Sequence, residues 1–450
     1  MAALLLMQYS MVANAVPTQL TTTMGVADFP DYRIDTGGNL HLVWADSGAI
    51  FYTMQNSAGA TLIDPVQIND VNVSGNSNTW PAMSTVGGLI YIVWQNTGDG
   101  EVWFMRLNPS LGPPDVNNSA VMAATIREVE TPISIGGGSN AVHPRIRGVT
   151  GGDMHVVWES TTGGSVEYMK VDTGGNLLNG PVALGGTASG ADLPDVDVDT
   201  NGHVHVVFGN NATTADNEIY YAMVDGTTGL KLIDATLLST DDGLRAGNVT
   251  VNVDTLDNTL YLVFKQALVN VVNGAEEIFL ARLDPSLDDQ DGSAASAAAI
   301  KLSELQITSG EGLLQWSVTS RIGLDKRLHA TYIDFDSNAC PSATPYTITD
   351  AHITFDGKII ARDTLTTTGA STSCFPQARL APRSNRIVWP DNSTGDTEIW
   401  SNVFSRVETG SRGFTCSLGG QGRTAWHAGD LWLLLGLFVL LAVRRSRRFG

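Results

Sequence analysis

Three arginines recur at one place in the sequence, each three residues after a proline: Arg33, Arg147 and Arg379. An arginine guanidinium binds a carboxylate through two parallel hydrogen bonds, so three of them on one wall could hold a carboxylated ligand. The alternative is that these arginines only neutralise acidic neighbours. The spacing therefore predicts either a ligand-binding set or a set of structural charges.

A second motif offers oxygen ligands for calcium. The segment 197–202 reads D-V-D-T-N-G and matches the first half of a calcium loop, with Asp197, Asp199 and Asn201 as ligands. No acidic residue follows at the spacing of the bidentate ligand, so a tight hairpin turn is the competing interpretation. We predict no other metal site and no other cofactor.

The chain has only three cysteines, and their spacing fits no metal motif. Cys340 and Cys374 flank one stretch of the body, and we predict a disulfide between them, with two free thiols as the alternative. Cys416 lies in the C-terminal segment and is the odd one out.

These residues must be positioned by a unit that is repeated seven times. Its core is a glycine-containing turn followed by a short apolar strand that ends in an aromatic residue, and the aromatic residues recur every 50 to 68 residues. They are Trp44, Trp94, Trp158, Phe208, Phe264, Tyr332 and Trp389. This period is typical of propeller blades, and we expect the aromatic residues to fill the core between blades. Histidines three positions earlier alternate with tyrosine, which favours hydrogen-bonded core residues over metal ligands.

The fold class predicted from this repeat is all-β: a seven-bladed propeller of four-stranded antiparallel blades. The prolines suit the first residue of each innermost strand, which places the three arginines near one end of a central channel. The seventh repeat has only three strands, so the segment 17–25 is expected to supply its outer strand and close the ring. Loops after the second strand of each unit vary in length, and loops of this kind usually carry binding.

The repeat architecture resembles the sialidase-like (BNR-type) propellers, and Tyr32-Arg33-Ile34 resembles the arginine-bearing motif of their first blade. The resemblance implies that Arg33, Arg147 and Arg379 could bind the carboxylate of a sugar. Sialidases also use a tyrosine nucleophile with a glutamate partner and an aspartate acid. The sequence has no S-x-D-x-G-x-T-W Asp-box, and Asp35 stands where the family has proline.

Both ends of the chain read as export signals. Residues 13–15 form an A-x-A cleavage pattern, so residues 1–15 are predicted to be a truncated signal peptide, with a frayed terminus as the alternative. Residues 410–450 combine Cys416, Gly419 and Gly420 with an apolar run and four terminal arginines. This pattern resembles the bacterial sorting tails of the GlyGly-CTERM and Myxo-CTERM type, which implies a short hydrophobic helix, a sorting protease and delivery to the cell surface. A permanent membrane anchor is the alternative.

Composition narrows the function. The 450 residues are 43% hydrophobic and 16% charged, which excludes simple disorder. The net charge of −20 argues against a nucleic-acid partner. Our leading hypothesis is an exported, cell-surface binding module for a glycan or a protein, formed by a monomeric body over residues 16–409. The alternatives are a sialidase-like glycoside hydrolase and a structural surface protein, so whether the chain is an enzyme stays open.

Overall fold

The computed structural model describes the chain in fourteen stretches. They are residues 18–21, 27–75, 77–112, 119–134, 140–185, 191–213, 216–239, 244–268, 276–308, 314–323, 326–335, 346–367, 386–391 and 398–403. The chain divides into two units, residues 1–406 and 407–450, and all described residues belong to the first. Arg379, the three cysteines and the predicted signal and sorting segments lie outside the described residues.

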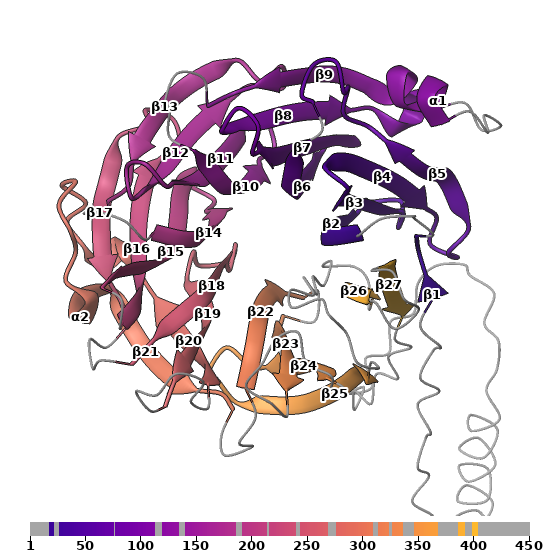
Figure 1. Ribbon diagram of the computed structural model, residues 1–450. Coiled ribbons are helices and arrows are strands. Elements are labelled where there is room, and N and C mark those ends of the chain that lie inside the picture. Colours follow the sequence, from indigo (N-terminus) through magenta and orange to yellow (C-terminus); the bar gives the residue numbers. More distant parts are fainter. Residues whose placement is uncertain are drawn as a thin grey trace, which may run out of the picture. The chain divides into compact units, whose positions relative to one another are not determined.

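The described body is a β-propeller whose blades are four-stranded antiparallel sheets (Figure 1). Blade one contains β2 (Ala27–Ile34), β3 (Leu40–Asp46), β4 (Ala49–Gln55) and β5 (Thr61–Gln67). Blade two contains β6 (Asn78–Val86), β7 (Leu89–Asn96), β8 (Glu101–Leu107) and β9 (Arg127–Pro132). Blade three contains β10 (Ala141–Gly148), β11 (Met154–Ser160), β12 (Ser165–Val171) and β13 (Leu177–Ala183).

The same order, from the innermost to the outermost strand, holds in three further blades. Blade four contains β14 (Ala191–Val198), β15 (His203–Thr213), β16 (Asp216–Asp225) and β17 (Lys231–Leu237). Blade five contains β18 (Ala246–Val253), β19 (Leu260–Ala267), β20 (Glu276–Leu283) and β21 (Lys301–Gln306). Blade six contains β22 (Leu314–Ile322), β23 (Leu328–Phe335), β24 (Tyr346–Ile353) and β25 (Ile359–Thr367). The innermost strands of successive blades contact one another from β2 through to β22.

The prediction of seven four-stranded blades is corrected to six. The remaining described strands are β1 (Thr18–Gln19), β26 (Arg386–Asp391) and β27 (Glu398–Val403), and they form a three-stranded sheet in the order β1-β27-β26. Its β26 and β27 contact β2 of blade one. This sheet joins the two ends of the body, because Thr18 pairs with Ser401 and Gln19 with Trp400 in antiparallel register.

A repeated polar clamp shows why the N-terminal segment fits this sheet. In blades two, four and five, a hydroxyl just after the outermost strand donates to the glutamate that leads the third strand and accepts the next backbone N–H at 2.8 to 2.9 Å. The pairs are Ser134 with Glu101, Ser239 with Glu218, and Thr308 with Glu277. Thr21 makes the same two bonds, to Glu398 and to Ile399 N–H. The N-terminal segment therefore takes the place of an outermost strand.

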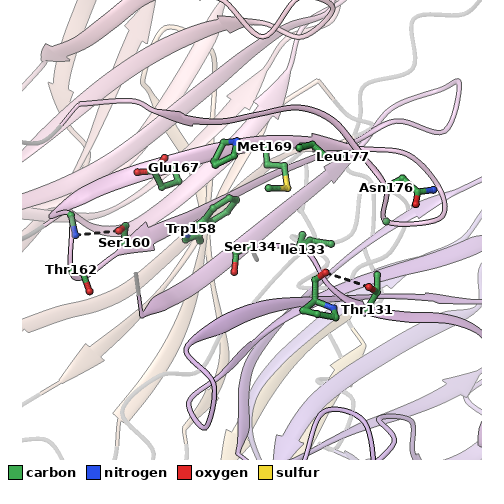
Figure 2. A pocket seen from close by; sticks show the side chains of 14 residues that line it. Thr131, Ile133, Ser134, Trp158, Ser160, Thr162, Glu167, Met169, Asn176 and Leu177 are labelled. Atoms are coloured by element: carbon green, nitrogen blue, oxygen red, sulfur yellow. Dashed lines mark hydrogen bonds between the residues drawn. The ribbon is translucent and has the colours of Figure 1, made fainter. Parts of the chain in front are cut away.

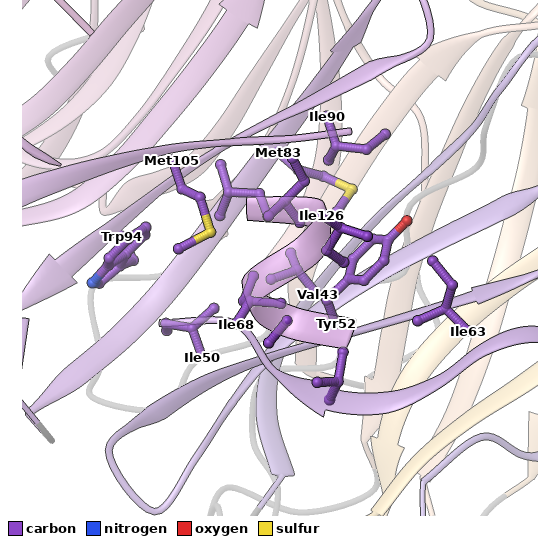
Figure 3. Close-up of a cluster of buried hydrophobic side chains, with 14 of the residues drawn as sticks. Val43, Ile50, Tyr52, Ile63, Ile68, Met83, Ile90, Trp94, Met105 and Ile126 are labelled. Carbon is purple, nitrogen blue, oxygen red and sulfur yellow. The ribbon is translucent and has the colours of Figure 1, made fainter. Parts of the chain in front are cut away.

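The core lies between neighbouring blades, as the apolar second strands predict. Trp44, Trp94 and Trp158 are at most 2% exposed, which confirms that the recurring aromatic residues are core residues. Figure 3 shows the cluster between blades one and two, where Trp94, Met83 and Met105 pack with isoleucines from both blades. Burial of such apolar area is the main stabilising term of the fold.

Each innermost strand has a β-bulge that the sequence analysis did not predict. The prolines do not begin these strands. They lie within them, and in four blades the residue before the proline has a positive φ: Phe29 (51°), Trp80 (52°), His143 (53°) and Leu193 (44°). The strand register shifts at this point in all six blades. A bulge of this kind redirects one side chain, and a positive φ on a bulky residue is energetically costly.

Two short helical stretches were also not expected. Between β8 and β9 lie η1 (Pro109–Leu111) and α1 (Ser119–Ile126), and between β20 and β21 lie η2 (Pro285–Leu287) and α2 (Ala297–Ile300). Asn108 and Asp284 cap the two η turns by accepting a serine N–H. No helix among the described residues is long and apolar enough to cross a membrane.

Candidate functional site

The two described arginines of the predicted carboxylate site are both paired with acidic residues. Arg33 Nη1 lies 2.7 Å from Asp31 Oδ1, within blade one. Arg147 Nε lies 2.8 Å from Asp197 Oδ1, so it joins blade three to blade four. Both arginines are close to the end of their strands, beside the uniform turn to the second strand, rather than near the start as predicted. The strands begin before the prolines, which explains this correction.

Acidic side chains of the innermost strands serve mainly to join neighbouring blades. Asp31 accepts the N–H of Met83 at 2.8 Å, across the contact of blades one and two. Asp197 accepts the N–H of Val253 at 3.0 Å, across the contact of blades four and five. A buried carboxylate that accepts backbone hydrogen bonds is well compensated. The arginine–carboxylate pairs belong to this set of joints between blades.

The proposed calcium ligands are bound by different protein groups. Asp199 Oδ1 accepts the N–H of Asn201 and the N–H of His203, each at 2.8 Å, which closes the turn. Asp197 is engaged with Arg147 and blade five, as described above. The hairpin interpretation of this segment accounts for these contacts. Sequence reasoning also missed Arg321, which faces His329 in the register where Arg33 faces His41. Its spacing of eight residues before that histidine was the available signal.

The bulges of blades one to three place a row of rings on the face that carries the variable loops. We call Phe29, Trp80 and His143 the aromatic row. Phe29 and Trp80 stack with ring centroids 4.0 Å apart, and His143 meets Trp80 edge-on at 4.5 Å. All three side chains are partly exposed. Each bulge lies beside the turn from the second to the third strand, as the pairing of Asp28 with Ala45 shows for blade one.

Polar groups accompany the aromatic row. His143 Nδ1 lies 2.9 Å from Glu159 Oε2, and the Phe29 N–H donates to Asp28 Oδ1 at 2.9 Å. Burial raises the pKa of Asp28 to about 6, and the hydrogen bond from Phe29 offsets only part of this rise. An aromatic surface with adjacent hydrogen-bonding groups suits a ligand that has both apolar faces and hydroxyls.

The raised pKa of Asp28 makes the stability of the protein depend on pH. The ordinary pKa is 3.8 and the folded value is about 6, so the folded state holds the proton more tightly than the unfolded chain. Stability therefore falls as pH rises from about 4 to about 6. We expect Asp28→Asn, which keeps an acceptor for Phe29, to increase the free energy of unfolding by about 1 to 3 kcal/mol at pH 7 and by nothing at pH 4.

Urea unfolding at pH 4 and pH 7 checks this expectation. Asp64→Asn is the control, because Asp64 is an exposed residue of β5. An equal effect of Asp28→Asn at both pH values would contradict the role of the buried carboxyl.

Comparison with known proteins supports the fold and not a family. No protein-family model and no curated protein matches the sequence. A PL25 ulvan lyase, solved bound to -[GlcA(1-4)Rha3S]-, matches 87% of this chain and 95% of its own at 9% identity, with a TM-score of 0.56. A further structure of PL25 ulvan lyase matches the same shares at 9% identity with a TM-score of 0.53. An oligogalacturonate lyase in complex with manganese matches 87% of this chain and 94% of its own at 13% identity, with a TM-score of 0.49. At such identities, the likeness shows the β-propeller fold alone.

A separate pocket of about 680 Å³ lies between blades two and three (Figure 2). In blades one, two, four and five, the recurring aromatic residue stacks on an aromatic residue of the third strand, as Trp94 does on Trp103. In blade three the partner of Trp158 in the register is Glu167. Both residues line the pocket, together with Ile133, Met169 and Leu177. The pocket therefore lies where the other blades have a second ring.

Burial raises the pKa of the Glu167 carboxyl, and a hydrogen bond from Ser165 at 2.8 Å partly opposes this. We expect Glu167→Phe to fill the pocket and stabilise the protein by about 1 to 2 kcal/mol, measured by thermal or urea unfolding. Glu167→Gln is the control, since it removes the charge without filling the space. If the phenylalanine variant is no more stable than the glutamine variant, the pocket does not arise from a missing ring.

Proposed function

We propose that the propeller is a non-catalytic module that binds a glycan across the aromatic row. The observation that carries this proposal is the stacking of Phe29, Trp80 and His143 on three successive innermost strands, on the variable-loop face. The faces of aromatic rings carry negative charge and attract the C–H groups of a sugar ring. Asp28 and Glu159 beside the row offer acceptors for sugar hydroxyls.

Backbone strain supports a functional role for the row. Each of its three side chains lies on a residue with φ near +50°, a conformation that glycine or asparagine adopts at lower cost. Strain of this kind costs about 1 to 3 kcal/mol per residue and is concentrated at functional sites. Three bulky residues in this conformation, side by side, are therefore better explained by ligand binding than by stability.

Charge favours a neutral glycan over a carboxylated one. Asp28 and Glu159 lie at the row, and the chain has a net charge of −20, so an anionic polymer would be repelled. Arg33 and Arg147 are already paired with Asp31 and Asp197. These pairings weigh against the sialidase-like hydrolase that binds a carboxylated sugar, and Arg379 lies outside the described residues.

The setting of this module is proposed from the sequence. We infer that the body is exported and displayed on the surface of a bacterium, with residues 1–15 as the remnant of a signal peptide and residues 410–450 as a tail that meets the membrane or a sorting protease. The tail carries a net charge of +5, opposite to that of residues 1–409, which suits contact with an anionic membrane.

Gel electrophoresis of the purified full chain through embedded polysaccharides tests the proposal. One set of gels contains neutral glucans, mannans and xylans, and the other contains polygalacturonate and ulvan. Retardation by a neutral polymer supports the proposal, and retardation by the anionic set alone overturns the choice of a neutral ligand. No retardation by either set favours a structural surface protein. Shortening of the polymer during incubation would show that the chain is an enzyme.

A further inference from the structure

Three blades share a buried pair of polar rings that sets the background for blade six. His41, His155 and His205 lie on the second strands and bond through Nδ1 to the hydroxyls of Tyr52, Tyr168 and Tyr221 on the third strands, at 2.8 to 2.9 Å. In each pair the rings are nearly parallel, at 14° to 23°. Burial lowers the pKa of His155 to about 4, so this imidazole is neutral at physiological pH. These pairs act as uncharged joints between strands.

Blade six replaces this pair with three potential metal ligands. His329 occupies the histidine position, but its register partner two residues on, Thr331, faces Asp350 where the other three blades have tyrosine. His329 itself faces His352 across the sheet. The two imidazoles are tilted by 55°, with ring centroids 4.5 Å apart. We call His329, Asp350 and His352 the blade-six cluster.

The atoms of this cluster converge on one carboxylate oxygen. Asp350 Oδ2 lies 3.2 Å from His329 Nδ1 and 3.0 Å from His352 Nε2. The three side chains are between 6% and 9% exposed. Among the described residues, this is the only group of three histidine, cysteine or acidic side chains whose ligand atoms all lie within 4.8 Å of one another.

These separations match those of ligands around a tetrahedral metal ion. Nitrogen and oxygen ligands bind zinc at about 2.0 to 2.1 Å, which puts neighbouring ligand atoms about 3.3 Å apart. The ion would therefore need only small side-chain shifts within β23 and β24. The Thr331 hydroxyl, 3.4 Å from Asp350 Oδ1, contacts the oxygen that the imidazoles do not share. Such an outer contact orients a metal-binding carboxylate.

We propose that the blade-six cluster binds one divalent transition-metal ion, zinc foremost. Two imidazoles and one carboxylate favour zinc and its first-row neighbours, whereas calcium and magnesium prefer oxygen ligands. The ion joins the second and third strands of blade six where other blades use a histidine–tyrosine bond. Three protein ligands leave one position for water or a further ligand.

The experiment uses the purified full chain, stripped with a chelator, dialysed against zinc and then against buffer. Metal is measured by plasma mass spectrometry. We expect the wild type to hold about one zinc more per chain than His352→Gln and Asp350→Asn, and to melt at a higher temperature with zinc than without. His155→Gln, which changes the corresponding histidine of blade three, is the matched control and keeps the wild-type zinc content.

Equal zinc content in the wild type and in the folded His352→Gln variant overturns the proposal. If the blade-six variants do not fold, cobalt loading of the wild type decides. A bound Co²⁺ in a four- or five-coordinate site gives visible ligand-field bands that are absent from cobalt in buffer, and the lack of such bands also overturns the proposal.

Discussion

Removal of residues 16–26 is expected to lower the melting temperature of the protein by roughly 10 °C or more. The deletion removes β1, the buried Leu20 side chain and the Thr21 hydroxyl, which bonds to both Glu398 and Ile399 N–H. Loss of one buried leucine and two buried hydrogen bonds costs about 5 kcal/mol. It also leaves the backbone of β27 without its partner, and an exposed sheet edge promotes aggregation.

Two variants separate the closure from the loss of a chain end. Removal of residues 1–15 alone leaves β1 intact and is expected to leave the melting temperature unchanged. Thr21→Val is expected to cost about 2 kcal/mol, as is Thr308→Val, which removes the same two bonds within blade five. A full-length melting temperature in the protein that lacks residues 16–26 would show that β1 does not support the body.

Trp80→Ala is expected to weaken glycan binding at least tenfold. Trp80 lies in the middle of the aromatic row and contacts both Phe29 and His143. Truncation of a central aromatic side chain commonly costs 2 kcal/mol or more of binding free energy, and each 1.4 kcal/mol is a factor of ten in affinity. Titration calorimetry with the glycan that retards the protein most gives the dissociation constants.

Leu193→Ala is the matched control for Trp80→Ala. Leu193 has the same bulge position and a positive φ in blade four, but it carries no ring. Its affinity is expected to stay within twofold of the wild type. If the two variants lose affinity equally, or if Trp80→Ala binds as the wild type does, the glycan does not lie on the aromatic row.

The architecture of the body could be predicted from the sequence because it rests on repeated local patterns. The apolar second strands and their terminal aromatic residues gave the strand order within each blade. The number of complete blades was overestimated, since the seventh repeat contributes only β26 and β27 to the described sheet. Two further repeats were present and overlooked: the hexapeptide R-L-N-P-S-L at 106–111 recurs as R-L-D-P-S-L at 282–287, and it marks both η turns.

The candidate site was less predictable, because it depends on backbone conformation and on contacts between blades. Spacing placed Arg33 and Arg147 in equivalent positions, but it could not show that each has an acidic partner. The residue before each proline was not considered, although Phe29, Trp80 and His143 share that position. Their positive φ values turn them into one surface, and no sequence period reports a φ angle. The blade-six cluster needed the cross-strand register of β23 and β24.

The pairing of Gln19 with Trp400 has a consequence for how the chain is made. The first strand to leave the ribosome must wait for a partner that is synthesised about 380 residues later. Blades one to six can each form from consecutive segments, whereas this last step closes the longest possible loop and pays its entropy at the end. Completion of the body is therefore a late, post-synthetic event. Until then the chain remains in a form that a translocation channel could still thread.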